Sequence, residues 1–378
     1  MQVFDGNEIE LNFDEGRDNV SPGDRGKTCF VYRGELLNEV CEYFGRPSDG
    51  LCLKIFFDPL EGEIEAYDWG KKWRKYSRDR CEEIGRLSKL TEATTIQNWL
   101  WMKDLAPRVY AIVLIERNGK QYPAQLTEFE RGSKYETVQE VQDQLDVIEK
   151  ELEKFKVGCA HRELIGRNDF LGGKVIDLQG YRFTNETRAA VKDWVESKGK
   201  YGKTHYQEIE KMGIMGKPRK TDKRIKAMKL DGIDFEGKDV LDVGCNSGAF
   251  CMYATDRGAR RVMGIDLAHH IQAARALNFF LGYHNVEYYS EDINEMEVIA
   301  FEDIDITLFL SMNIHVGFPE WVANTKLLIF EENAKQSKFN PACWQEELSR
   351  YFDDVKMVGT TNDQNEKYYK PIFHCRKT

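Results

Sequence analysis

The chain lacks the features that mark membrane proteins, secreted proteins and generic nucleic-acid binders. No uncharged apolar run in its 378 residues reaches the roughly 18 residues that span a bilayer. The opening stretch, MQVFDGNEIELNF, is acidic and has no apolar core of signal-peptide length. The net charge of −10 argues against a nucleic-acid partner without excluding one. These absences predict a soluble, cytoplasmic protein.

The sequence also lacks paired metal-ligand or disulfide spacings. Its nine cysteines are scattered, with no close CxxC pair and no cluster of histidines and cysteines. In a reducing compartment such cysteines are most simply buried thiols. We therefore expect neither disulfides nor a zinc site.

What the sequence does contain is a glycine-punctuated segment at 239–250, DVLDVGCNSGAF. An apolar strand there runs into a turn and then into a helix, which is typical of a nucleotide-binding crevice. A second apolar run ends at Asp266, 24 residues after Asp242, a spacing that fits one strand-helix-strand unit. Gly244 and Gly248 would let the backbone pass close to a ligand. Asp266 would accept hydrogen bonds from two ribose hydroxyls.

The loop also indicates which nucleotide binds. Asp242 precedes the first glycine by two residues and suits a ligand with an ammonium group, whereas a dinucleotide site presents bare amides to a pyrophosphate. DVGCNSG resembles motif I of the class I S-adenosylmethionine (SAM)-dependent methyltransferases, and GIDL, SEDIN and DITLFLSMNIH resemble the ribose, adenine and fourth-strand motifs. This resemblance, from about Thr204 to the C-terminus, implies SAM as the cofactor. The residues that it implies for SAM binding are Asp242, Gly244, Cys245, Asn246, Gly248, Asp266, Leu267, Asp292, Ile293 and Leu310.

Apolar runs of strand length alternate with helix-compatible stretches throughout this part of the chain. Two further strand-like runs, joined by a polar loop, resemble the closing antiparallel hairpin of the methyltransferase sheet. We therefore expect an α/β fold, with a Rossmann-like seven-stranded methyltransferase domain at 236–378. The predicted strands are 238–243, 261–266, 286–289, 304–310, 326–331, 355–360 and 370–376.

The methyl acceptor must be aligned with the SAM sulfonium and, if it is a hydroxyl, deprotonated. His315 follows the fourth predicted strand and is the candidate base, although a lone histidine is more often structural. Asn313 could orient the acceptor. Neither an NPPY-like motif nor a catalytic cysteine loop is present. We expect an oxygen acceptor on a small molecule, sugar or phosphate.

The first 185 residues carry a second set of motifs. Lys54 lies in the apolar run LCLKIFF, where a lysine is costly unless an anion meets it. HRELIGRN at 161–168 resembles the catalytic loop of protein kinases, and KVIDLQG resembles the strand and metal-binding aspartate of the DFG motif. The resemblance implies an α+β kinase-like domain at 1–185 that binds ATP and Mg²⁺. It assigns nucleotide binding to Lys54, Glu92, Asn168 and Asp177, the metal to Asn168 and Asp177, and the position of the base to Glu163.

This part also departs from the kinase pattern. Glu163 replaces the general-base aspartate, Leu178 and Gln179 replace the last two DFG positions, and no helical lobe follows Asp177. Glu82 and Glu83 compete with Glu92 for the role of the lysine's ion-pair partner. A working small-molecule kinase, a nucleotide-binding pseudokinase and a scaffold without a ligand all stay open.

Between the two parts we expect a basic helical connector at 186–235. From 198 to 229 it has 11 lysines and arginines against three acidic residues. It could cap the SAM pocket, with Arg224 on the cofactor carboxylate, or be a solvated linker. The whole chain is then a methyltransferase, or a bifunctional enzyme similar in parts to the kinase and methyltransferase fusions that cap bacterial O-antigens. The alternative is a non-catalytic adaptor that senses SAM and ATP.

Overall fold

The computed structural model describes fourteen stretches of the chain. The chain divides into two compact units, residues 1–190 with 279–284 and residues 191–278 with 285–378. Most of the predicted connector 186–235 therefore falls in the second unit, while the predicted domain boundaries stay predictions. The described stretches are 2–7, 29–56, 87–130, 132–133, 135–159, 170–176, 178, 181–198, 205–219, 221–293, 303–312, 318–333, 341–361 and 370–377.

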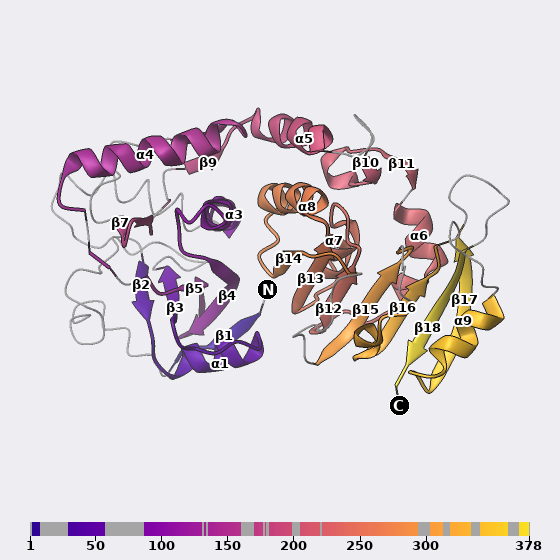
Figure 1. Ribbon diagram of the computed structural model, residues 1–378. Coiled ribbons are helices and arrows are strands. Elements are labelled where there is room, and N and C mark those ends of the chain that lie inside the picture. The colour runs from indigo at the N-terminus through magenta and orange to yellow at the C-terminus, as the bar shows by residue number, and fades with distance from the viewer. Residues whose placement is uncertain are drawn as a thin grey trace. The chain divides into compact units, whose positions relative to one another are not determined.

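The first unit contains a five-stranded sheet in the order β1-β4-β5-β3-β2 (Figure 1). Neighbouring strands are antiparallel, except that β1 runs parallel to β4. Its core is apolar side chains of the strands and of α1. The predicted Lys54 strand is β3. The elements are β1 (Val3–Asp5), β2 (Cys29–Tyr32), α1 (Glu35–Tyr43), β3 (Leu51–Phe56), α3 (Leu87–Trp101), β4 (Val109–Arg117) and β5 (Lys120–Glu128).

After this sheet comes the amphipathic helix α4 (Val138–Glu153). Thr137 and Glu140 form a reciprocal capping box that satisfies the amides at its start. One face of the helix is buried through Val141, Leu145, Ile148 and Leu152, which recur at helical spacing. Short strands follow: β6 (Val157–Cys159), β7 (Phe170–Leu171), β8 (Lys174–Val175) and β9 (Tyr181–Phe183).

The second unit is built on a sheet in the order β14-β13-β12-β15-β16-β18-β17 (Figure 1). The first five strands are parallel, and β18 lies antiparallel between β16 and β17. Each predicted strand segment of this part is a strand in the structure. They are β12 (Asp239–Val243), β13 (Arg261–Asp266), β14 (Val286–Ser290), β15 (Ile304–Leu310), β16 (Thr325–Glu331), β17 (Asp354–Thr361) and β18 (Lys370–Arg376).

The apolar runs of these strands form the core of the second unit. Val243, Ile265, Phe309, Phe330 and Phe373 belong to one buried cluster. Parallel strands are apolar along their length because helices cover both faces of the sheet. The helices are α6 (Thr221–Ala227), α7 (Ala249–Thr255), α8 (Ala268–Leu281) and α9 (Pro341–Leu348), with 3-10 turns η3 (Glu210–Met212), η4 (Leu230–Gly232) and η5 (Glu320–Ala323).

The predicted helical connector is helical only in part. It contains α5 (Thr187–Lys198) and α6, but also the parallel strand pair β10 (His205–Gln207) and β11 (Gly216–Arg219). Gly213, with a φ of +63°, ends η3 in the left-handed conformation and prevents a continuous helix. In the part of the chain that is described, no helix is both long and apolar enough to cross a bilayer.

Candidate functional site

The glycine loop after β12 lies at the carboxyl edge of the parallel sheet. The strand order changes direction at β12, which has β13 on one side and β15 on the other. Ligands of open α/β sheets bind in the crevice outside this edge at such a switch point. The backbone amides of Gly244 and Cys245 both donate to the carbonyl of Ile265, at 2.8 and 3.1 Å, which fixes the loop to β13.

Gly244 is required by its conformation and by its surroundings. Its φ is +76°, in the left-handed region that favours glycine. A Cβ placed there would lie 1.8 Å from Sδ of Met312, the residue that follows Ser311 at the end of β15. Gly248 has a φ of +82°, and a Cβ there would lie 2.3 Å from the hydroxyl of Tyr288. The loop therefore passes its neighbours at distances that only glycine permits.

Asp266, the predicted ribose ligand, organises the loop from the end of β13. Its Oδ2 accepts the amide of Asn246 at 2.8 Å, and its Oδ1 accepts the amide of Leu267 at 2.7 Å. The first bond holds Asn246 at a φ of +52°. Each carboxylate oxygen has a further acceptor position, so the carboxylate can hold the loop and still meet a ligand.

Asp242, the predicted partner of an ammonium group, is 1% exposed. Burial raises the pKa of its carboxyl to about 7, while the Cys251 thiol and the Arg224 charge act in the opposite direction. The Cys251 thiol donates to Oδ2 at 3.4 Å. A cation that entered this site would favour the ionised form.

The other predicted SAM ligands differ in exposure. Cys245 and Asn246 of the loop are buried, as are Ile293 and Leu310. Leu267, directly after Asp266, is 44% exposed, and Asp292 is half-buried. Leu267 thus presents an apolar side chain beside the Asp266 carboxylate, as a ligand with an apolar ring would require.

Gln207 of β10 is a site residue that sequence reasoning missed. Its Oε1 accepts the amide of Ala249, the first residue of α7, at 3.2 Å, and the hydroxyl of Ser247 at 3.4 Å. It thereby satisfies one of the free amides at the start of a helix. No local pattern marks it, because β10 is only three residues long.

Arg224, the predicted ligand of the cofactor carboxylate, is paired with another side chain in the structure. Its guanidinium, 6% exposed, forms an ion pair with the fully buried carboxylate of Glu331 and stacks on the Phe250 ring at 4.9 Å. Glu331 also accepts hydrogen bonds from the hydroxyls of Ser311 and Thr361. The partner that the structure shows for Arg224 is thus a side chain of β16, and its contact with a cofactor stays a prediction.

The predicted acceptor loop is described only at its beginning. Ser311 has a φ of +58°, and its hydroxyl accepts a hydrogen bond from Nζ of Lys370 at 3.3 Å. Asn313 and His315, the predicted acceptor-orienting residue and base, lie outside the described residues.

In the first unit, Lys54 reaches the chain beside Asp177. Its Nζ donates to the carbonyl of Ile176 at 3.0 Å. Glu92 of α3, the predicted ion-pair partner, accepts a hydrogen bond from the backbone amide of Phe183. The described residues thus bring Lys54 next to the DFG-like segment. Glu163, Asn168 and Asp177 themselves lie outside the described residues.

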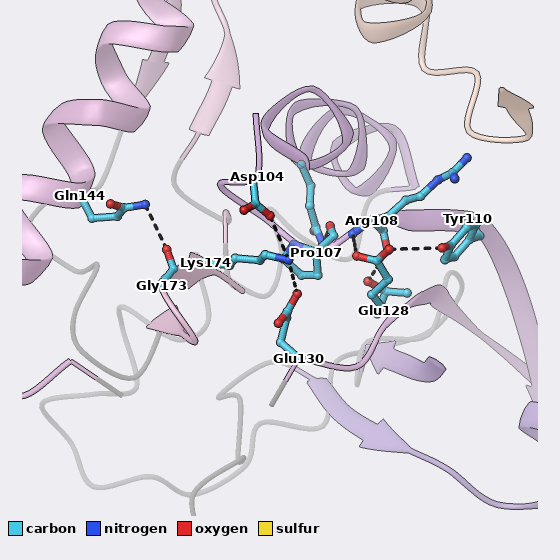
Figure 2. Close-up of polar contacts among 11 residues, drawn as sticks. Asp104, Pro107, Arg108, Tyr110, Glu128, Glu130, Gln144, Gly173 and Lys174 are labelled. Carbon is cyan, nitrogen blue, oxygen red and sulfur yellow. Dashed lines mark hydrogen bonds and ion pairs between the residues drawn. The ribbon is translucent and has the colours of Figure 1, made fainter. Parts of the chain in front are cut away.

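The hairpin of β7 and β8, which precedes Asp177, is held from several directions, as Figure 2 shows. Lys174 forms ion pairs with Glu130 at 2.7 Å and with Asp104 at 3.2 Å. The hydrogen bond that Lys174 donates to Glu130 is the main reason that the pKa of Lys174 is raised. Gln144 of α4 donates to the carbonyl of Gly173 at 3.0 Å. These contacts fix the hairpin of β7 and β8. They therefore also fix the position of Ile176, whose carbonyl Lys54 contacts.

Metal ligands are not gathered in the described stretches. No group of three or more His, Cys, Asp or Glu side chains that could hold a metal ion occurs among them. Both predicted metal ligands, Asn168 and Asp177, fall outside those stretches. The proposed magnesium site thus stays a prediction.

Comparison with known proteins bears on the second unit. Residues 218–311 match the family model of FtsJ-like methyltransferases. A segment of 48 residues is 48% identical to ribosomal protein L11 methyltransferase of Shewanella pealeana, covering 12% of this chain and 16% of that protein. A segment of 32 residues is 59% identical to protein arginine N-methyltransferase 1 of Dictyostelium discoideum, covering 8% and 9%. The chain thus spans a small fraction of these curated relatives.

Two solved structures are also similar. The bifunctional kinase-methyltransferase WbdD has 19% identity and a TM-score of 0.40, over 49% of this chain and 46% of that one. Magnesium protoporphyrin IX methyltransferase (ChlM) of Synechocystis PCC 6803 with bound SAM has 19% identity and a TM-score of 0.33, over 42% and 77%. The family match includes the glycine loop, so residues 218–311 are similar to an FtsJ-like domain of the SAM-dependent methyltransferases.

Proposed function

We propose that the second unit transfers the methyl group of SAM to an oxygen atom of a small molecule, sugar or phosphate-bearing acceptor. The observation that carries this proposal is the glycine loop tied to Asp266, with buried Asp242 beneath it. In this arrangement Asp266 can bind the ribose hydroxyls, and Asp242 can bind the ammonium group of SAM. The two loop glycines have no Cβ atoms, so the backbone can approach the ligand closely. SAM supplies an activated methyl group, and the chain's part is to bind and align the two reactants.

Truncation of Asp266 tests the cofactor site. Asp266→Ala should weaken SAM binding by about 2 to 3 kcal/mol, since the variant loses a bidentate acceptor and the amide of Asn246 loses its partner. Isothermal titration calorimetry measures the affinity. Asp256→Ala is the matched control, because this carboxylate of the same unit pairs with Lys211 at the surface. Unchanged affinity in Asp266→Ala would remove the site.

The raised pKa of Asp242 predicts that SAM binding depends on pH. Burial raises the pKa of the Asp242 carboxyl to about 7. A bound ammonium favours the carboxylate and lowers this pKa, so binding releases a proton near neutral pH. Affinity should then fall as the pH drops below about 7, by up to about tenfold per pH unit. Calorimetry in two buffers of different ionisation enthalpy counts the protons. Equal affinity at pH 6 and pH 8 in the wild type, or the same pH dependence in Asp242→Asn, contradicts this.

For the first unit we propose a kinase-like domain that binds a nucleotide or the substrate. The support is the contact of Lys54 with the backbone of Ile176, directly before Asp177. Glu163 in place of an aspartate would displace a base by about one bond, and misplacement of about 1 Å can reduce rates by about 100-fold. A bifunctional kinase and methyltransferase and a non-catalytic sensor of SAM and ATP are the alternatives.

A thermal-shift titration with Mg·ATP and Mg·GTP tests the nucleotide site. A ligand at 100 times its Kd stabilises by about 2.7 kcal/mol, so the melting transition should move upward. We expect weak, magnesium-dependent binding that Lys54→Met abolishes, and no protein-kinase activity. Lys120→Met, an exposed lysine of the same sheet, should behave as the wild type. No shift with either nucleotide would leave this unit a scaffold.

A further inference from the structure

The side chain of Asn246 connects the cofactor loop to the start of α8. Its Nδ2 lies 3.1 Å from Nδ1 of His270, in the first turn of that helix. Its Oδ1 accepts a hydrogen bond from the Ser247 hydroxyl at 3.2 Å, which fixes the amide with Nδ2 toward the imidazole. Asn246 is 8% exposed, so loss of a partner would leave a buried polar group unsatisfied. The His270 ring thus contacts the cofactor loop directly.

The backbone of Asn246 is bound to the predicted ribose ligand. Its amide donates to Oδ2 of Asp266 at 2.8 Å, and its φ is +52°, where few residues other than glycine are found. Such a backbone conformation persists only where neighbouring groups hold it. The imidazole of His270 is one of those groups, since it binds the side chain of the same residue. His270 therefore acts on the loop beside Asp266 through Asn246.

The contact between Asn246 and His270 requires a neutral imidazole. The amide Nδ2 can only donate, so Nδ1 must accept, which it does in the tautomer that carries its proton on Nε2. A proton on Nδ1 would place two donors opposite each other. The Asn246 amide cannot turn over to compensate, because its Oδ1 would then lose the Ser247 hydroxyl. Protonation of His270 therefore breaks the hydrogen bond.

Neighbouring groups act on the charge of this imidazole in both directions. The hydrogen bond from Asn246 favours the neutral ring, and the His269 ring, with its centroid 3.9 Å away, disfavours a second positive charge when it is itself protonated. Acidic groups at the carboxyl ends of the adjoining strands favour the imidazolium. Histidine is the side chain that ordinarily changes its charge between pH 5 and 8, so the effect is sought in that range. The acidic groups are Asp242 on β12, Asp266 on β13, and Glu291 and Asp292 after β14.

We propose that His270 is a positioning residue of the cofactor site, whose neutral imidazole holds Asn246 and the loop beside Asp266. This rests on the proposed methyltransferase function, because Asp266 is the predicted ligand of the SAM ribose. Protonation of His270 by water releases the Asn246 side chain and weakens binding of the adenosine part of the cofactor. The imidazole thereby makes occupancy of the site depend on pH.

A ligand without an ammonium group separates His270 from the titration of Asp242. 5′-Methylthioadenosine keeps the adenine, the ribose and the sulfur of SAM but lacks the amino-acid part. Calorimetry measures the affinity for SAM at pH 8 and for 5′-methylthioadenosine at pH 8 and pH 5.5. His270→Ala removes the acceptor, and His270→Asn keeps an acceptor oxygen near the position of Nδ1 but does not titrate. His269→Asn is the matched control, because His269 is an exposed histidine of the same helix turn.

We expect His270→Ala to bind both ligands about 5- to 10-fold more weakly than the wild type at pH 8, and His270→Asn to bind them within about twofold of it. At pH 5.5 the wild type should bind 5′-methylthioadenosine about as weakly as His270→Ala does. Neither His270 variant should change its affinity between the two pH values, whereas His269→Asn should behave as the wild type. A ring that only filled space would give neither the pH dependence nor its loss in His270→Asn.

Equal SAM affinity of His270→Ala and the wild type overturns the assignment. It is also overturned if the pH dependence persists in His270→Asn or disappears in His269→Asn. Circular dichroism checks the fold, and if His270→Ala is unfolded, the wild type and His270→Asn at the two pH values decide. If only SAM binds measurably, the loss in His270→Ala and its rescue in His270→Asn at pH 8 decide. Absent SAM binding in the wild type overturns the proposed function itself.

Discussion

Gly244→Val is expected to abolish SAM binding while the second unit stays folded. The valine Cβ would meet Sδ of Met312 at 1.8 Å, and a β-branched residue is strained at a φ of +76°. Relief of the clash moves either the cofactor loop or the Ser311–Met312 turn. We expect a loss of affinity greater than about 100-fold, or about 2.7 kcal/mol, in calorimetry. Circular dichroism checks the fold.

Gly237→Val separates steric clash from backbone strain. Gly237 also has a positive φ, +66°, but nothing lies within 4 Å of the position of its Cβ. The variant carries a similar conformational penalty, about 1 to 2 kcal/mol, without a clash at the loop. It should lose stability and keep its SAM affinity. If Gly244→Val bound SAM as the wild type does, the glycine loop would not be the cofactor site.

The second large effect is on stability. Glu331→Ala should destabilise the second unit by about 3 to 5 kcal/mol, because it leaves the Arg224 guanidinium buried without its carboxylate partner. Urea unfolding measures the loss. Asp256→Ala, which breaks the exposed pair with Lys211, should lower stability by at most about 1 kcal/mol.

A double variant distinguishes the unpaired charge from the loss of packing. Arg224→Met with Glu331→Leu replaces the buried pair by apolar side chains and should recover most of the stability. If stability recovers but SAM turnover stays low, the ion pair of Arg224 and Glu331 is needed to position the residues of the site. A double variant as unstable as Glu331→Ala would contradict the charge argument.

The central strands β12, β13 and β15 of the second unit could be predicted because each is an apolar run with side chains buried on both faces of the sheet. The glycine loop and Asp266 could be predicted for a related reason, since a turn, a close approach and a strand-end carboxylate all leave local signals. These signals depend on a few neighbouring residues only. They carry no information about partners that come from distant parts of the chain.

Gln207, Arg224 and Glu331 show where local reasoning ends. Gln207 lies in a three-residue polar strand, and its contact with the start of α7 bridges about 40 residues of chain. The expected contact of Arg224 with the cofactor stays a prediction, and its partner in the structure is Glu331, 107 residues away. In the sequence FEEN nothing distinguishes Glu331 from Glu332. Only contacts from α6, from the end of β15 and from the end of β17 to the Glu331 side chain separate their environments.

The contact between Gln207 and the glycine loop has a practical consequence for dissecting the protein. The sequence places the start of the methyltransferase domain at 236, and expression of 236–378 alone would follow from that boundary. Such a fragment would retain every motif of the family but lose the side chain that accepts the Ala249 amide and the guanidinium that neutralises Glu331. If that fragment were inactive, the cause would be the loss of these contacts and not the absence of activity in the full protein. A fragment of the methyltransferase part should therefore begin before β10.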